Sequence, residues 1–289
     1  MTSRESAFLL RAWPCAVQRI EDVEYAAPGG QRLFADLYIP EGARERPPVI
    51  VWLHPGGWIA GDRKTAPDLS RFLAERGFAM VSVDYRLSRQ AIFPAALEDV
   101  KSAIAWVRSA GNAYGFDGDR IGLWGASAGG HLAALAALSD RSLGVRAVAD
   151  VYGPTDFLKM GPEHRSAKSF ESRFLGASIE TAPELVRRAN PAEYADPGAP
   201  PFLILHGTED RDVECGQSVL LYETLAASGN NVTLCLIEGL GHGFLENDFG
   251  ERPAGRVWLR EARPGLEEFA GDGPPVGYGT LETFFRKWL

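Results

Sequence analysis

A serine lies at a sharp corner between an apolar run and an alanine-rich helix, in the stretch GLWGASAGGHLAAL from Gly122 to Leu135. Ser127 has alanine on both sides, and Gly125, Gly129 and Gly130 surround it. A strand that turns directly into a helix brings the two backbones close together, so such a corner tolerates only small side chains. One interpretation is a plain tight turn, and the other is a reactive hydroxyl held above the end of the strand.

The rest of the chain alternates between strand-like and helical segments. Continuous apolar runs at 49–53 and 78–83 are typical of buried parallel strands, and residues 32–40 alternate as a half-buried strand does. Further strands are expected at 120–124, 146–152, 202–205 and 232–237, and helices at 66–77, 93–111, 215–229 and 280–289. This alternation predicts an α/β sheet with helices on both faces.

A single domain over residues 1–289 is expected, because neither an internal repeat nor a linker divides the chain. Two insertions interrupt the alternation, a loop-rich one at about 153–200 and one at about 247–279. The second combines many Gly and Pro with large apolar residues, among them Phe249, Trp258, Leu259 and Phe269. Exposing these groups together would create a sticky patch, so we expect residues 247–279 to fold over the active site as part of a cap. The alternative is that they pack on the side of the domain or form a subunit contact.

Charge and cysteine content bear on partners and location. The formal net charge is −8, whereas nucleic-acid binding relies on clustered Lys and Arg, so no nucleic-acid partner is expected. Three cysteines without CxxC spacing favour neither a disulfide framework nor a zinc site, and a cytoplasmic location is the simpler expectation. We expect no membrane insertion and no signal peptide, because no sufficiently long apolar stretch occurs. The sequence leaves open whether the protein forms a homodimer.

The residues 125–129 match G-x-S-x-G, and the strand before them and the helix after them are the context of a nucleophilic serine. A serine needs a base, and the base needs an acid that orients it. His242 lies in EGLGHGF, after the strand at 232–237, where a loop can reach the serine, and is the expected base. His54, His131 and His206 are expected to hold local structure, and His164 lies in a polar loop.

The orienting acid is expected in the loop that follows the strand at 202–205, in FLILHGTEDRDV. Asp210 lies a few residues into this loop and is the expected acid. Asp212 is the alternative, and either carboxylate could instead cap a helix. Asp156, in YGPTDF, is expected to be a turn residue.

A glycine-rich loop, HPGGW, follows the buried strand at 49–53. Pro55 has no N–H, so the amides of Gly56 and Gly57, joined by that of Ala128, are the expected donors to an oxyanion. The alternative is a glycine-rich turn that binds nothing. The large aromatic residues Trp58 and Trp258 are the expected substrate contacts, although Trp58 could equally be a packing residue.

With these residues in place, the chain resembles the α/β-hydrolase superfamily, and within it the bacterial carboxylesterase/lipase group related to hormone-sensitive lipase and to feruloyl and acetyl-xylan esterases. The matching stretches, over roughly residues 22–246 and the last helix, are HPGGWIAGDRK, VSVDYRLS, FPAALEDVKSAIAWVR, YGFDGDRIGLWGASAGGHLAAL, PPFLILHGTEDRDV and EGLGHGF. Two motifs depart from the usual pattern: Pro55 replaces a glycine of H-G-G, and Glu214 stands where D-x-x-V-P has proline. Residues 247–279 have no counterpart in the common pattern.

The resemblance implies an α/β-hydrolase fold with a mostly parallel, eight-stranded sheet. It also implies hydrolysis of a small-molecule carboxylic ester by Ser127, Asp210 and His242 through an acyl-enzyme, with neither a metal nor an organic cofactor. An arylformamidase or another amide or peptide hydrolase is an alternative with the same triad. A hydrolase-like ligand receptor is an alternative from another class, because a fold does not fix a function.

Overall fold

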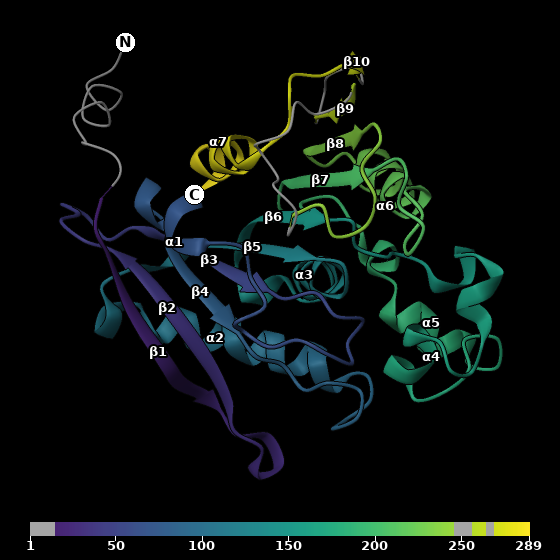
Figure 1. Ribbon diagram of the computed structural model, residues 1–289, viewed down its shortest axis with the longest axis horizontal. Helices are drawn as coiled ribbons and strands as arrows, with labels where there is room; N and C mark the ends of the chain where they lie inside the picture. Colours follow the sequence, from purple (N-terminus) through teal and green to yellow (C-terminus); the bar gives the residue numbers. More distant parts are fainter. Residues whose placement is uncertain (1–14, 246–255, 264–268) are drawn as a thin grey trace.

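A single ten-stranded sheet forms the centre of the computed structural model, which describes residues 15–245, 256–263 and 269–289 (Figure 1). The strands are β1 (Val17–Ala26), β2 (Leu33–Pro40), β3 (Pro48–Leu53), β4 (Ala79–Val83), β5 (Asp117–Ala126), β6 (Val145–Val151), β7 (Phe202–Gly207), β8 (Val232–Ile237), β9 (Val257–Ala262) and β10 (Phe269–Asp272). Their order is β1-β2-β4-β3-β5-β6-β7-β8-β9-β10. The six neighbouring strands β4, β3, β5, β6, β7 and β8 pair in parallel. Antiparallel strands extend both edges of the sheet, β2 and β1 beside β4, and β9 and β10 beside β8.

Helices cover both faces of the sheet, as the sequence predicts (Figure 1). The helices α2 (Ala95–Tyr114), α3 (Ala128–Ser139) and α6 (Gly216–Ala227) pack on one face, and α1 (Leu69–Phe72) and α7 (Tyr278–Trp288) on the other. Each face has its own cluster of buried apolar residues. The apolar α3 is buried from Ala128 to Leu138, because it lies between α2, β5, β6 and the segment that follows β6.

The insertion at 153–200 consists of short helices beside α3. They are η5 (Phe157–Lys159), η6 (Pro162–Arg165), α4 (Phe170–Leu175), α5 (Pro183–Ala189) and η7 (Pro191–Tyr194). Phe157, Phe174 and Val186 belong to the same apolar cluster as α2 and α3, so the insertion packs as part of the domain core. The remaining short turns are η2 (Pro28–Gly30), η3 (Ala74–Arg76) and η4 (Arg141–Leu143).

The structure corrects the expected strand number and shows where the described part of residues 247–279 lies. The prediction of eight strands is wrong, because β9 pairs with β8 and β10 pairs with β9, both antiparallel. The described part of this insertion therefore extends the sheet instead of covering the active site. In this position Val257 and Leu259, which lie on one face of β9, pack into the apolar cluster on the α7 side. Phe249 lies outside the described residues.

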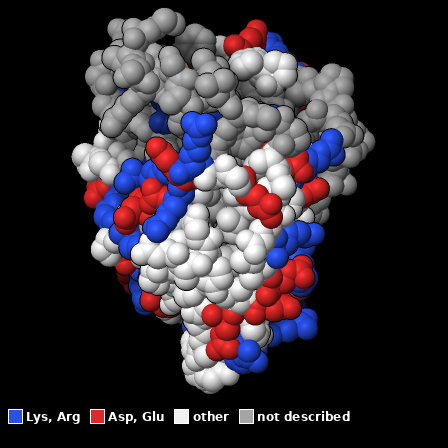
Figure 2. Space-filling view, turned by 90° about the vertical axis from the view of Figure 1, so that its left-hand side faces the viewer, with Lys and Arg blue, Asp and Glu red and all other residues white. Residues whose placement is uncertain are grey.

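The outer strand β1 carries charges of both signs. Lys64 pairs with Glu21 at 3.6 Å, and Arg32 pairs with Glu24 at 2.6 Å. Figure 2 shows acidic and basic side chains side by side on this face of the molecule. Such charges disfavour pairing of the exposed strand edge with another chain. Within the described residues, no helix has both the length and the apolar composition that crossing a membrane requires.

Candidate active site

Ser127 forms the corner between β5 and α3 in a strained conformation, with φ 53° and ψ −121°. Its amide donates to the Val151 carbonyl at 2.9 Å, and its carbonyl accepts from the His131 amide at 3.0 Å. A Cβ at Gly125 would lie 2.2 Å from the Gly129 oxygen, and one at Gly129 would lie 2.0 Å from the Leu53 oxygen. The glycines are thus required by the close approach of α3 to β3 and β5.

The structure brings Ser127, His242 and Asp210 together in one chain of hydrogen bonds. The Ser127 hydroxyl lies 2.9 Å from Nε2 of His242, and Nδ1 of His242 lies 2.7 Å from Oδ2 of Asp210. The three residues follow the carboxyl ends of β5, β8 and β7, which meet at one edge of the parallel sheet. Asp212 is exposed and contributes only its backbone amide, which donates to Asp210 at 3.0 Å.

Two loops hold His242 against Asp210. The amide of Thr208 donates to the Ile237 carbonyl at 3.0 Å, and that of Glu209 donates to the Leu240 carbonyl at 2.9 Å. Gly207 allows this contact, because a Cβ there would lie 2.1 Å from the Leu240 oxygen. The loops after β7 and β8 therefore form one unit, and the predicted base and acid come from its two halves.

Asp210 is buried and surrounded by hydrogen-bond donors. Burial opposes its ionisation, but donors from His206, His242 and the Val213 amide outweigh burial and hold the pKa of Asp210 well below its usual range. His206, fully buried, places Nε2 at 3.2 Å from Asp210 and 2.8 Å from the Val213 carbonyl, and its Nδ1 accepts from Ser218 at 2.7 Å. Sequence analysis assigned His206 to local structure but missed its contact with Asp210. The available signal for this contact was that Asp210 follows His206 by four residues, just beyond the end of the strand.

The loop after β3 has backbone geometry suited to an anion. Gly56, Gly57 and Trp58 all have positive φ, at 124°, 57° and 57°. Within the described part of the chain, the amides of Gly56, Gly57 and Ala128 donate no hydrogen bond. The loop lies against the start of α3, since a Cβ at Gly129 would be 2.7 Å from the His54 oxygen. Successive free amides beside a helix N-terminus are suited to binding an oxyanion.

Residues of the stretch VSVDYRLS hold this loop in place. Tyr85 donates to the His54 carbonyl at 2.8 Å and stacks on the His54 ring at 4.2 Å. The Ser88 amide and hydroxyl both donate to the Trp58 carbonyl, at 2.7 and 2.9 Å. Asp84 binds the guanidinium of Arg63 at 2.9 Å, which fixes the far end of the loop. His54 is therefore structural, as predicted.

Neither tryptophan lies where a substrate contact is expected. Trp58 is 2% exposed and stacks on Phe174 at 4.6 Å, so it is a packing residue. Its place in the core depends on the insertion at 153–200. Trp258 lies in β9, four strands from β5, which corresponds to roughly 19 Å from the strand that carries Ser127. The expectation that Trp258 covers the site fails because its strand pairs with β8.

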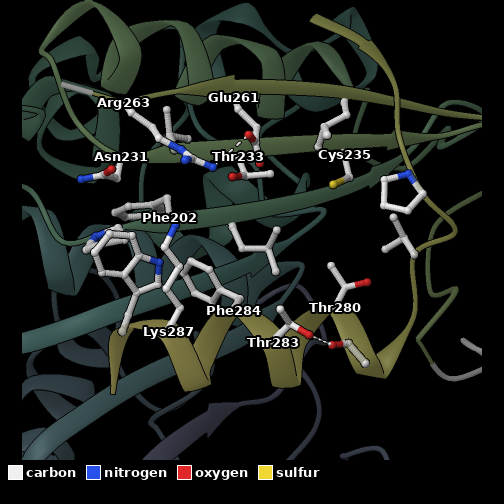
Figure 3. A pocket seen from close by; sticks show the side chains of 18 of the residues that line it. Phe202, Asn231, Thr233, Cys235, Glu261, Arg263, Thr280, Thr283, Phe284 and Lys287 are labelled. Carbon is white, nitrogen blue, oxygen red and sulfur yellow. Dashed lines mark hydrogen bonds and ion pairs between the residues drawn. The ribbon is translucent and has the colours of Figure 1, made fainter. Parts of the chain in front are cut away.

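A large cavity of about 750 Å³ lies away from these residues, between α7 and the strands β7, β8 and β9 (Figure 3). Phe202, Thr233, Glu261, Phe284 and Lys287 are among its lining residues, and none of the predicted site residues belongs to the lining. A cavity of only about 10 Å³ touches Pro55, Ala126 and Tyr152 beside the serine. Volume alone therefore does not locate the candidate site, whereas the hydrogen-bond geometry does.

The family model BD-FAE matches residues 35–225, about two thirds of the chain. The chain belongs to the BD-FAE family. The matched range holds the serine corner, the glycine-rich loop and Asp210, whereas His242 lies beyond it. BD-FAE membership agrees with the resemblance to α/β-hydrolase esterases that the sequence motifs indicate.

Several curated relatives of this BD-FAE chain are named as esterases. Esterase LipQ of Mycobacterium tuberculosis is 37% identical over 223 residues, which cover 72% of this chain and 53% of LipQ. Isoprenylcysteine alpha-carbonyl methylesterase ICME of Arabidopsis thaliana is 28% identical over 227 residues, which cover 72% of this chain and 53% of ICME. The chain thus spans about half the length of the curated relatives that it matches.

Solved structures similar to this chain confirm the α/β-hydrolase fold. A truncated carbohydrate esterase from gut microbiota has a TM-score of 0.74 and 27% identity, covering 83% of this chain and 94% of that one. Esterase 2 of Thermogutta terrifontis has a TM-score of 0.63 and 27% identity, covering 80% of this chain and 84% of that one. The fold therefore extends over most of both chains in each comparison.

Proposed function

We propose that this protein hydrolyses carboxylic esters, with Ser127 as nucleophile, His242 as base and Asp210 as the acid that orients the base. One observation carries the proposal: hydrogen bonds of 2.9 and 2.7 Å link Ser127 to His242 and His242 to Asp210. Such a series activates a hydroxyl that is otherwise a weak nucleophile. The names of the relatives support ester hydrolysis as the reaction class.

In the first step, Nε2 of His242 takes the proton of Ser127 while the serine oxygen attacks the ester carbonyl. Asp210 accepts a hydrogen bond from Nδ1–H, which fixes the tautomer of the imidazole and stabilises the imidazolium that forms. The free amides of Gly56, Gly57 and Ala128 donate to the negative charge that develops on the carbonyl oxygen. The ionised state of Asp210 is secured by its low pKa.

In the second step, the imidazolium of His242 gives its proton to the alcohol oxygen, and the alcohol leaves an acyl group on Ser127. Water then attacks this acyl-enzyme, with His242 again taking the proton. The acid is released, and the serine hydroxyl is restored. Side chains and backbone amides of the chain suffice for each step, so we expect EDTA to leave the activity unchanged.

A panel of substrates tests this function. The purified chain is assayed with p-nitrophenyl esters of rising acyl length, feruloyl esters, acetylated sugars and a formylated arylamine. We expect turnover of at least one ester class in the presence of EDTA. Hydrolysis of the formylated arylamine alone would favour the amide hydrolase instead. Tight binding of an ester without turnover would favour the ligand receptor.

A further inference from the structure

The most exposed large apolar side chains of the described chain belong to segments around α4. Ile92, Leu158 and Phe170 are 52%, 41% and 50% exposed. Ile92 lies in the loop after β4, and Leu158 and Phe170 lie in the insertion after β6. These segments leave the sheet at the carboxyl ends of the parallel strands, the edge at which Ser127 lies. Single exposed apolar residues are ordinary, whereas exposed apolar residues on segments that leave this edge are candidates for substrate contact.

Phe170 contacts the loop that holds the proposed oxyanion donors. A Cβ at Gly57 would lie 3.0 Å from both Cγ and Cδ1 of Phe170, so the ring rests against the Cα of Gly57. The Gly57 amide is one of the donors that would bind the carbonyl oxygen of an ester. A substrate bound there lies within reach of the half-exposed face of the Phe170 ring.

The helix α4 is anchored so that Phe170 stays at the surface. The Ser169 hydroxyl accepts from the Ser172 amide at 3.1 Å, and Glu171 accepts from Nδ1 of His164 at 3.0 Å. Phe174 is 2% exposed, stacks on Trp58, and accepts at its carbonyl from the Phe93 amide at 2.7 Å. Rotation of the helix to bury Phe170 would break these contacts.

The second apolar residue, Ile92, lies against the other end of α4. A Cβ at Gly176, which follows the helix, would lie 2.6 Å from Cδ1 of Ile92. Leu158 follows Phe157, whose ring lies 5.5 Å from Trp58 and 6.3 Å from Phe174. The two residues therefore lie on elements packed against α4 and against the glycine-rich loop.

We propose that Phe170, with Ile92 and Leu158 around α4, forms the surface that binds the hydrocarbon part of the ester substrate beside the scissile bond. This inference rests on the proposed ester hydrolysis. It assigns a preference for esters with an apolar chain or ring on one side of the carbonyl. Phe170 is then a specificity-determining residue, because it contacts substrate but takes no part in the chemistry.

The test is kcat/KM of Phe170→Ala over two series of esters. One series extends the acyl chain of p-nitrophenyl esters from acetate to octanoate, and the other extends the alcohol of acetate esters. We expect the preference for long over short substrates to fall by about tenfold or more in one series, with the shortest ester little affected. Phe170→Leu, which keeps an apolar side chain, should retain most of the preference. The matched control is Phe284→Ala, a half-buried aromatic that lines the distant cavity (Figure 3) and should leave the preference unchanged.

An equal effect of Phe170→Ala on all esters, or an effect on unfolding alone, would overturn the inference. Loss of a dimer in Phe170→Ala, seen by size-exclusion chromatography at the assay concentration, would show that a second copy covers the surface instead. If the unmodified chain hydrolyses no ester, the proposed function itself fails. If it hydrolyses esters and the preference survives in Phe170→Ala, only the inference about Phe170 fails.

Discussion

The Nε2 atom of His206 lies 3.2 Å from Oδ2 of Asp210, beneath the loop that follows β7. The same carboxylate oxygen faces Nδ1 of His242 at 2.7 Å, and the other oxygen accepts from the Val213 amide at 2.9 Å. Donors therefore approach Asp210 from the core and from the active site together. This arrangement fixes the carboxylate in position before any substrate binds, so that it can orient His242.

Replacement of the orienting acid should be far more damaging than replacement of its neighbour. Asp210→Asn is expected to lower kcat by a factor on the order of 10⁴, because the amide favours the wrong imidazole tautomer. Asp212→Asn, on the same loop but exposed, should retain most of the activity. Steady-state kinetics with one good ester compares the two. Equal, mild losses would mean that another carboxylate orients His242.

The proposed role of the glycine-rich loop in binding the oxyanion can be tested by comparing two glycines with nearly equal backbone angle φ. Gly57 has φ +57° and Gly29 has φ +59°, so alanine strains the backbone similarly at both. Gly29 has open space around it, whereas Gly57 carries a proposed oxyanion donor and touches Phe170. Gly57→Ala keeps the amide N–H, but the strain and the contact with Phe170 should displace this donor, so we expect kcat to fall by a factor on the order of 10². Gly29→Ala should leave kcat unchanged.

Thermal unfolding of both variants provides the control for strain. Each should lose about 1–2 kcal/mol of stability from the left-handed conformation. Gly57→Ala should lose somewhat more, because its Cβ would lie 3.0 Å from the Phe170 ring. If Gly57→Ala loses stability but keeps full activity, the glycine-rich loop is a turn without a catalytic role.

Asp150 should make the stability of the protein depend on pH. It is 1% exposed, accepts from the Gly153 amide at 3.1 Å, and has no described partner for its second oxygen. Burial raises the pKa of Asp150 to about 7. In the unfolded chain the carboxyl ionises near its ordinary pKa of about 4, so the folded state binds more protons between about pH 4 and 7. Its contribution to stability is present in full below pH 4 and is lost as pH rises to 7.

Asp150→Asn removes this dependence, because the amide stays neutral and can still accept from Gly153. Relative to the unmodified chain, the free energy of unfolding of the variant should rise by on the order of several kcal/mol between pH 4 and 8. Urea unfolding at the two pH values measures the difference. The exposed Asp119→Asn is the control and should show little change. A constant difference between Asp150→Asn and the unmodified chain at both pH values would contradict the buried neutral carboxyl.

The sequence predicts the centre of the molecule better than its edges. The α/β alternation and the serine corner are visible because local rules create them: small residues at the turn, apolar runs for buried strands, and loops at the carboxyl ends of those strands. The structure brings Ser127, Asp210 and His242 together as expected from these local rules. The roles of the three residues in catalysis remain predictions.

Long-range pairing explains what the sequence did not reveal. The residues of β9 lie among many Gly and Pro and are fixed by hydrogen bonds to β8, a choice that no local pattern encodes. In the sequence, Trp58 follows two glycines and could be a pocket wall or a core residue. It is a core residue because it stacks on Phe174, which lies 116 positions further along the chain. The contact of Phe170 with Gly57 likewise joins distant segments.

The central claim is that Ser127 attacks the ester carbonyl, and Ser127→Ala tests it most directly. The unmodified chain and the variant are compared by kcat on the best ester, and by mass spectrometry after treatment with an aryl phosphonate ester. We expect the variant to stay folded, to lose on the order of 10⁴ or more in kcat, and to take up no phosphonate. The unmodified chain should take up one phosphonate, on the peptide that contains Ser127. Near-normal turnover by Ser127→Ala, or labelling of another residue with loss of activity, would contradict the account.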